Sequence, residues 1–185
     1  MRDDADLLRI LSEIQRRGAI GRTTTLRDEI AHADGFVASL PDTVSTLVDL
    51  GSGGGLPGLV IAHRRRDIHV TLIERRAKRA DLLRYGVRGL ALEGSVDVAQ
   101  GDAVDIASRW AALADVVTAR SFGPMWMVLE TAAWFTDIDG WALVSEPPGQ
   151  VTELGASELS SGGWRDAGVT HGIHRFHRFH VEPRR

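Results

Sequence analysis

A glycine-rich segment beginning at Gly51 carries the clearest chemical signal in the sequence. It follows a short apolar run that ends in Asp49-Leu50, and it continues through Gly58 into a predicted helix. Glycine adopts positive φ without strain and lets a ligand approach the backbone, because it has no Cβ. The helix, with Pro57 at its start, presents free N–H groups and the positive end of its dipole. The segment therefore predicts a loop that binds a nucleotide cofactor.

Two cofactor classes fit the spacing of these glycines. From Gly53 to Gly58 the segment matches G-x-G-x-x-G, the dinucleotide fingerprint, and Glu74 follows about twenty residues later, as that fingerprint expects. From Asp49 to Gly55 it matches D-x-G-x-G-x-G, the pattern of S-adenosylmethionine (SAM) methyltransferases. Asp49 favours SAM, because a carboxylate attracts its ammonium and sulfonium groups and repels a pyrophosphate. A glycine-rich turn without a ligand is the remaining interpretation.

Acidic residues at the ends of the next two predicted strands supply further candidate contacts. Glu74 can accept hydrogen bonds from both ribose hydroxyls, or it is a solvated glutamate at a helix start. Asp102 can hold the adenine amino group or cap the following helix, and these two roles can coexist. The predicted cofactor-binding residues are Asp49, Gly51, Ser52, Gly53, Gly55, Leu56, Glu74, Arg75, Asp102, Ala103 and Arg120.

Arg120-Ser121-Phe122 follows the fourth predicted strand, where a target nucleotide would meet the methyl group. An arginine and an aromatic residue suit a guanine or its phosphate, by charge and by stacking. We therefore predict that Arg120 is the catalytic residue in the sense of substrate positioning, with no general base. In the alternative interpretation, Arg120 pairs with Asp115 or Asp49.

The segment Ser145-Glu146-Pro147-Pro148-Gly149 is similar to the S/D/N-P-P-aromatic tetrad of amino-group methyltransferases. That tetrad belongs after the fourth strand, whereas this segment follows the fifth, carries an extra glutamate and lacks the aromatic residue. We interpret it as a rigid loop beside the substrate groove and not as a catalytic motif.

Three histidines near the C-terminus, His174, His177 and His180, have the composition of a metal cluster. On a strand, however, His177 would face away from the other two. We expect an edge strand with a basic face that can lie against RNA phosphates, and no metal site.

The order of predicted elements is that of an α/β fold. Strands alternate with helices, so we expect a Rossmann-like, doubly wound, mostly parallel sheet with a C-terminal antiparallel hairpin. Ligands bind outside the carboxyl ends of such strands. The residues at these ends are Asp49, Glu74, Asp102 and Arg120. The predicted strands are 46–50, 68–74, 95–99, 115–119, 140–144, 164–170 and 173–181, and the predicted helices are 3–17, 25–39, 59–64, 77–88, 104–113 and 124–134.

The chain is long enough for one compact domain with a sizeable core. Residues 1–41 contain two short amphipathic helices, which we expect to form an N-terminal helical cap because they are too short to enclose a core of their own. Residues 42–185 are predicted to form a SAM-dependent methyltransferase domain.

Composition excludes several function classes. The sequence has no cysteine, which rules out disulfides, thiolate metal sites and cysteine nucleophiles, including those of pyrimidine C5-methyltransferases. The net charge of −3 is not that of a polycation that coats nucleic acid, although local arginine clusters can still hold an RNA. The chain shows neither a membrane-spanning apolar stretch nor a signal-peptide pattern, so we expect a cytoplasmic protein.

Three segments together resemble the GidB family: residues 49–58 with their Leu-Pro-Gly ending, residues 70–74 followed by two arginines, and residues 119–122. These are bacterial SAM-dependent methyltransferases of the rRNA small subunit methyltransferase G group, which act on guanine N7 of 16S ribosomal RNA. The resemblance implies a class I methyltransferase fold, SAM as cofactor with S-adenosylhomocysteine as product, and ribosomal RNA or the small ribosomal subunit as partner. We expect a monomer that binds neither DNA nor membranes.

The chain departs from the family pattern in two places. An asparagine-leucine-threonine motif and a histidine-containing helix are usual near the N-terminus, and only Glu29-Ile30-Ala31-His32 is similar here. After the fifth strand the family has a lysine-glycine, where this chain has residues 146–149. A small-molecule methyltransferase, a non-catalytic SAM- or RNA-binding paralogue and an NAD-dependent oxidoreductase therefore stay open as alternatives.

Methylation of guanine N7 is compatible with the residues present. N7 has a free lone pair, so the reaction needs no general base and no covalent nucleophile. The work of the site is to align donor and acceptor. The target base must be unstacked to reach the pocket.

Overall fold

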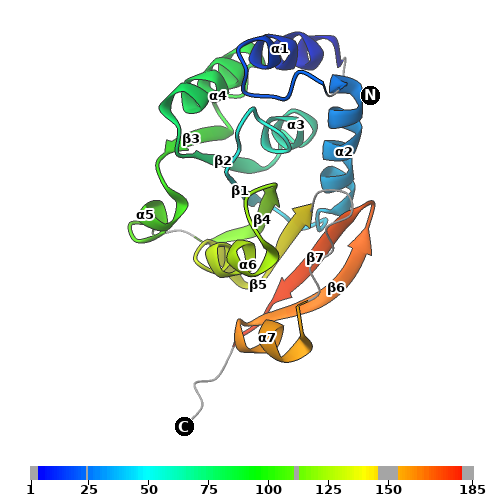
Figure 1. The fold of residues 1–185 in the computed structure, drawn as a ribbon, viewed down its shortest axis with the longest axis vertical. Helices are drawn as coiled ribbons and strands as arrows, with labels where there is room; N and C mark the ends of the chain where they lie inside the picture. The colour runs from blue at the N-terminus through cyan, green and yellow to red at the C-terminus, as the bar shows by residue number, and fades with distance from the viewer. Residues whose placement is uncertain (1–3, 24, 111–112, 146–153, 181–185) are drawn as a thin grey trace.

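The computed structural model describes residues 4–23, 25–110, 113–145 and 154–180. Helices pack on both faces of a seven-stranded sheet with the order β3-β2-β1-β4-β5-β7-β6 (Figure 1). The strands are β1 (Thr46–Leu50), β2 (His69–Glu74), β3 (Val96–Gln100), β4 (Ala114–Arg120), β5 (Thr136–Ser145), β6 (Trp164–Thr170) and β7 (Ile173–Arg178). The helices are α1 (Asp4–Arg16), α2 (Leu26–Ser39), α3 (Gly58–Arg64), α4 (Ala77–Gly89), α5 (Ala103–Ala107), α6 (Met125–Ala133) and α7 (Ala156–Ser161).

The first five strands are parallel, and β7 joins them in the antiparallel direction with β6 at its outer edge. The chain order reverses between β1 and β4, which are neighbours in the sheet. A ligand site is expected outside the carboxyl ends of the strands at such a point. The predicted doubly wound, mostly parallel sheet with a C-terminal antiparallel hairpin is confirmed.

Two hydrophobic clusters cover the two faces of the sheet. Alternate residues of β1 point to opposite faces, so Leu47 belongs to the cluster under α1 to α4, and Val48 and Leu50 belong to the cluster under α5, α6 and α7. Because both faces are covered, the central strands are apolar at nearly every position. Asp49 is the charged exception in β1, and it is fully buried.

The N-terminal helices α1 and α2 contribute side chains to the hydrophobic cluster under α1 to α4, which we call the first cluster. The apolar stripe of α1 is buried against the rest of the protein, and burying each of its leucine and isoleucine side chains contributes about 1.5–3 kcal/mol. A Cβ on Gly89 of α4 would lie 2.3 Å from Ile10 Cδ1, so the two helices approach closely. Arg64 at the end of α3 bonds Asp34 of α2 at 2.9 Å and also pairs with Asp4 of α1. These contacts fix α1 and α2 on the sheet.

Four elements differ from the sequence prediction by more than one residue at an end. Strand β7 ends at Arg178 although the prediction continued it to residue 181, and it lies between β5 and β6, so it is not the edge strand that we expected. Helix α5 ends at Ala107 instead of continuing to residue 113. Strand β5 begins at Thr136, earlier than predicted, because Thr136 pairs with Ala114 before a register shift leads into the regular ladder. Helix α7 was not predicted, since its one buried residue, Leu159, gives no helical periodicity. None of the helices within the described residues has the length and apolar character that a membrane span requires.

Candidate functional site

The loop between β1 and α3 has the backbone that its glycines predict. Gly51, Gly53 and Gly55 have φ of 65°, 54° and 94°, a region that residues with a Cβ rarely adopt. Ser52 is buried in this loop and donates its Oγ hydrogen to the carbonyl of Asp49 at 3.0 Å. Its backbone N–H donates to the carbonyl of Ile73 at 2.9 Å, which joins the loop to the end of β2.

Glu74 at the end of β2 holds the same loop from the other side. Its Oε2 accepts from the backbone N–H of Gly53 at 3.0 Å, and its Oε1 accepts from that of Arg76 at 2.8 Å. The residue is only 4% exposed, so it is not the solvated glutamate of the alternative interpretation. Each carboxylate oxygen retains a lone pair for a further donor.

Asp49 lies below the loop and not on the groove that the loop borders. Its Oδ1 accepts from Thr118 Oγ1 of β4 at 2.7 Å, and its Oδ2 has no hydrogen-bond partner among the described residues. A Cβ on Gly58 would lie 2.6 Å from that Oδ2, so the start of α3 rests directly on the carboxylate. Complete burial raises the pKa of Asp49 to about 6, although the hydrogen bond from Thr118 acts in the opposite direction.

Asp102 caps α5. Its Oδ1 accepts from the backbone N–H of Val104 at 3.0 Å, which is the N-cap geometry considered for it from the sequence. Asp102 and Ala103 also border the groove described next, so the cap and a ligand contact are compatible.

A groove of about 710 Å³ runs along the carboxyl ends of β1, β2 and β3 to α6. Five of the predicted residues line it: Gly51, Glu74, Arg75, Asp102 and Ala103. The other predicted residues do not: Asp49, Ser52, Gly53, Gly55, Leu56 and Arg120. Ser52, Gly53, Gly55 and Leu56 belong to the same loop as Gly51, which lines the groove, and Asp49 lies beneath this loop and accepts a hydrogen bond from Ser52.

Several lining residues were not predicted as site residues. Arg79 comes from α4 and Arg76 directly precedes that helix, whereas Trp126 and Met127 come from α6 and Trp134 directly follows it. The α6 side chains are large and apolar yet exposed, a feature that would have indicated a binding surface. The sequence alone does not show it, because α6 also has a buried apolar face.

Phe122, in the segment after β4, closes the groove beside Gly51. A Cβ on Gly51 would lie 2.8 Å from Phe122 Cδ2. Glycine is therefore required at this position both by its positive φ and by the aromatic ring packed against it.

The side chain of Arg120 points away from the groove, toward α2, and forms an ion pair with Glu29 of that helix. It pairs neither with Asp115 nor with Asp49, the two partners considered from the sequence. Asp115 accepts instead from the backbone N–H groups of Ser45 and Thr46 at 2.8 and 2.9 Å.

The ion pair lies in a half-buried polar cluster at the ends of β4 and β5. Arg120 Nη1 has no hydrogen-bond partner among the described residues. His32 of α2 shares a hydrogen bond of 2.9 Å with Ser145 Oγ, and burial followed by the charge of Arg120 lowers the pKa of His32. None of these side chains lines the groove.

The two remaining motifs add no site residue. Ser145 ends β5, whereas residues 146–149 lie outside the described part of the chain. On β7, His174 bonds Asp166 of β6 at 2.9 Å, and the ring of His177 lies 4.7 Å from that of Trp141. Among the described residues, no group of three side chains is arranged to hold a metal ion.

Comparison with known proteins gives a consistent result. A family model described as GidB, rRNA small subunit methyltransferase G, matches residues 33–146. The ribosomal RNA small subunit methyltransferase G of Salinispora tropica is 47% identical over 85 residues, which cover 44% of this chain and 35% of that protein. That of Kineococcus radiotolerans is 35% identical over 108 residues, covering 58% and 38%. The matched region thus spans little more than a third of these relatives.

Solved structures show the fold. Cofactor-bound Rv0187 from MTB superposes with a TM-score of 0.68 at 14% identity, covering 95% of this chain and 90% of that one. An O-methyltransferase from Bacillus cereus in complex with SAH gives a TM-score of 0.60 at 15% identity, covering 78% and 67%. The chain has the class I SAM-dependent methyltransferase fold that the sequence predicted.

Proposed function

Because this chain belongs to the GidB family, rRNA small subunit methyltransferase G, we propose that it binds SAM and methylates guanine N7 of 16S ribosomal RNA. The observation that carries this proposal is the groove, in which the β1–α3 loop and Glu74 meet at the carboxyl ends of the parallel strands. The resemblance on which the sequence prediction rested is confirmed by the family match.

The residues of the groove fit the cofactor. The free lone pairs of Glu74 suit the ribose hydroxyls, and Asp102 with Ala103 stands where the adenine would lie. Gly51 lines the groove, so the loop at this point can contact the methionine part of the cofactor. Ser52, Gly53, Gly55 and Leu56 hold the loop in shape. Asp49, with its unbonded Oδ2, supplies negative potential beneath the ammonium group.

The chemistry is a direct transfer of a methyl group from a sulfonium, which SAM supplies when bound. N7 attacks with its own lone pair, so this chain's residues have to position the base and exclude water. Ser121 and Phe122 line the groove beside Gly51, where the acceptor meets the donor. Arg120 does not line the groove, so its positioning role is indirect: its ion pair with Glu29 holds the end of β4, from which Ser121 and Phe122 follow.

The groove also fits a polyanionic substrate. Arg75, Arg76 and Arg79 line its α4 side, and none of them has a carboxylate partner among the described residues. Arginine side chains with free donors bind phosphate by charge and by paired hydrogen bonds. We therefore place the RNA backbone along α4.

The remaining expectations belong to this proposal. We propose one compact domain in which residues 1–41 form a helical cap on residues 42–185. We also propose a monomer that acts in the cytoplasm on ribosomal RNA or the small ribosomal subunit.

The decisive experiment measures transfer of labelled methyl groups from SAM to small ribosomal subunits that lack native guanine-N7 methylation. Label recovered as 7-methylguanosine supports the cofactor, the reaction and the substrate class together. SAM binding without transfer to subunits or to naked rRNA would overturn the rRNA assignment and favour a small-molecule methyltransferase or a non-catalytic paralogue. Binding of NADH in place of SAM would overturn the cofactor assignment.

A further inference from the structure

Three side chains form a stripe along the outer surface of α6, at intervals of four residues. Trp126 and Trp134 are 53% and 60% exposed, although indoles of this size are usually largely buried. Glu130 lies between them in sequence and is also exposed. We call Trp126, Glu130 and Trp134 the tryptophan ridge.

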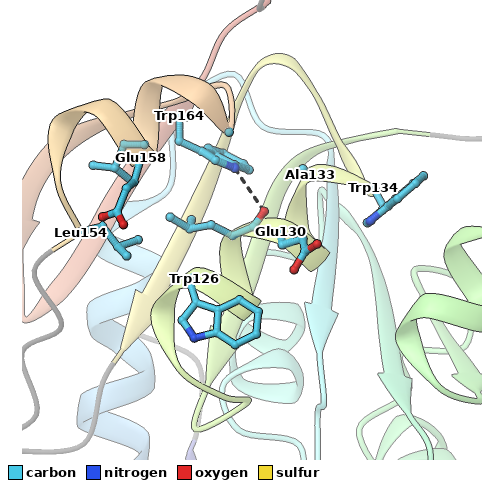
Figure 2. A pocket seen from close by; sticks show the side chains of 10 residues that line it. Trp126, Glu130, Ala133, Trp134, Leu154, Glu158 and Trp164 are labelled. Atoms are coloured by element: carbon cyan, nitrogen blue, oxygen red, sulfur yellow. Dashed lines mark hydrogen bonds between the residues drawn. The ribbon is translucent and has the colours of Figure 1, made fainter.

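The tryptophan ridge separates the cofactor groove from a second cavity, since its three residues line both. The second cavity has a volume of about 360 Å³ and lies between α6 and α7 (Figure 2). Its apolar wall includes Leu154 and Trp164, and Trp164 Nε1 donates to the carbonyl of Leu129 at 3.1 Å. This hydrogen bond fixes the wall opposite the ridge.

The charges around the second cavity are acidic. Glu130 and Glu158 line it, and no lysine or arginine does so among the described residues. Glu158 Oε2 already accepts from the backbone N–H of Gly155 at 2.9 Å. The carboxylate of Glu130 has no hydrogen bond or ion pair to any residue in the part of the chain that the structure describes, so it is available to a ligand.

Exposed indoles beside a free carboxylate define the chemistry of the occupant. Indole faces stack with flat ring systems. A carboxylate only accepts hydrogen bonds, so it selects a ring edge with two adjacent N–H donors. Among the four RNA bases, only guanine has such an edge, N1–H and N2–H₂. Adenine and cytosine present a donor beside an acceptor, and uracil presents one donor between two acceptors.

We propose that the tryptophan ridge binds an unpaired guanine base of the RNA substrate, stacked on an indole and donating N1–H and N2–H₂ to Glu130. The RNA part of this inference rests on the proposed function. The second cavity, which this guanine would fill, lies across the tryptophan ridge from the cofactor groove. The bound guanine would therefore be a neighbour of the base that accepts the methyl group.

The distribution of charge supports this orientation of the RNA. The cations of Arg75, Arg76 and Arg79 are on the α4 side of the groove, and the carboxylates are on the far side of the ridge. Phosphates are attracted to α4 and repelled from the second cavity, while a neutral base edge with N–H donors is accepted there.

The test compares guanosine, inosine and adenosine 5′-monophosphates by quenching of tryptophan fluorescence. The three probes carry the same phosphate and ribose, so they differ in the base edge alone. We expect saturable quenching by the guanosine nucleotide, with about tenfold weaker binding of the adenosine nucleotide. The inosine nucleotide, which lacks N2–H₂, should lie between them.

Glu130→Gln should change which nucleotide the protein prefers. A loss of folding would weaken the binding of every nucleotide and could not produce such a change. A glutamine amide offers one acceptor and one donor, which pair with adenine N6–H and N1. This variant should therefore bind the adenosine nucleotide better than the guanosine nucleotide. Glu158→Gln is the matched control, because it removes a charge from the same cavity at a carboxylate that is already bonded, and it should keep the guanine preference.

Each outcome of the test has a definite meaning. Equal binding of the three nucleotides, or stronger binding of arginine amide than of any nucleotide, would overturn the proposal, and the second result would assign the ridge to a protein partner. Guanine binding that saturating S-adenosylhomocysteine abolishes would place the base in the cofactor groove and also overturn it. SAM binding is measured on the same samples, so a failure of the proposed function is seen separately from a failure of the ridge.

Discussion

Glu74 accepts a hydrogen bond from the backbone N–H of Gly53 at 3.0 Å, so the end of β2 fixes the conformation of the β1–α3 loop. The other carboxylate oxygen accepts from Arg76 at the entrance to α4. One buried side chain thus organises two of the segments that border the groove. A ligand that contacts Glu74 therefore contacts the same carboxylate that holds the β1–α3 loop through Gly53.

Glu74→Gln should weaken SAM binding and lower stability together. The amide group that replaces one oxygen is a donor, so it faces a backbone N–H that then loses its acceptor. An unsatisfied buried N–H costs about 1–3 kcal/mol. We expect a roughly tenfold or greater rise in the Kd for SAM by calorimetry and a lower Tm. Glu93→Gln, at an exposed position, is the matched control and should change neither. Unchanged SAM affinity in Glu74→Gln would remove Glu74 from the cofactor site.

Local patterns made much of this site predictable. The strand that ends at Glu74 and the glycine spacing are both encoded within a few residues, so sequence placed Glu74 and the loop correctly. The orientation of Asp49 depends on which face of the sheet receives α3, which is a property of the whole fold. For this reason its place below the loop was not foreseen.

Contacts between distant segments were the least predictable. Arg120 is at a strand end, as expected, but its partner Glu29 comes from α2, which packs there through the apolar residues of the first cluster. The exposure of Trp126 likewise depends on what covers α6 after folding. Sequence shows that residue as one more apolar member of a helix.

Asp49 should make stability depend on pH in the acidic range. Its pKa is raised by burial to about 6 in the folded protein, above the ordinary aspartate value of 3.8. The folded state therefore binds the proton more tightly, and stability falls as pH rises from about 4 to about 6. The difference in pKa corresponds to about 3 kcal/mol. Denaturant unfolding of wild type and Asp49→Asn across this range tests it, since the difference between the two proteins should lose this pH dependence above about pH 6.

The opposite slope, with wild type gaining stability over Asp49→Asn as pH rises through this window, would show that the carboxylate is stabilised as an anion. In that case a bonded donor, and not burial, would dominate its environment.

The ion pair between Arg120 and Glu29 should be energetically coupled and should matter for catalysis. Their side chains are 23% and 11% exposed, so removing one partner leaves a poorly solvated charge. In a double-mutant cycle of Arg120→Ala and Glu29→Ala, we expect a coupling energy of about 1–3 kcal/mol. Arg120→Ala should also reduce the rate of methyl transfer by about 100-fold with a smaller change in SAM affinity, as expected of a positioning residue.

Arg120→Lys separates charge from geometry at this position. Lysine keeps the cation and loses the planar fork, so it should retain part of the stability and little of the activity. If Arg120→Ala transfers methyl groups at the wild-type rate, Arg120 acts only as the structural partner of Glu29.

Gly51→Ala should damage the groove for two separable reasons. Its φ of 65° disfavours any Cβ, and that Cβ would lie 2.8 Å from the ring of Phe122. Gly18 has φ of 84° with nothing within 4 Å of a Cβ, so Gly18→Ala measures the backbone strain alone. We expect Gly18→Ala to cost about 1 kcal/mol and Gly51→Ala clearly more, with loss of SAM binding. Adding Phe122→Ala to Gly51→Ala should recover the steric part and leave the strain, as measured by denaturant unfolding. Equal costs for the two glycine variants would show that the ring moves away freely, and Phe122 would then not be a fixed wall of the groove.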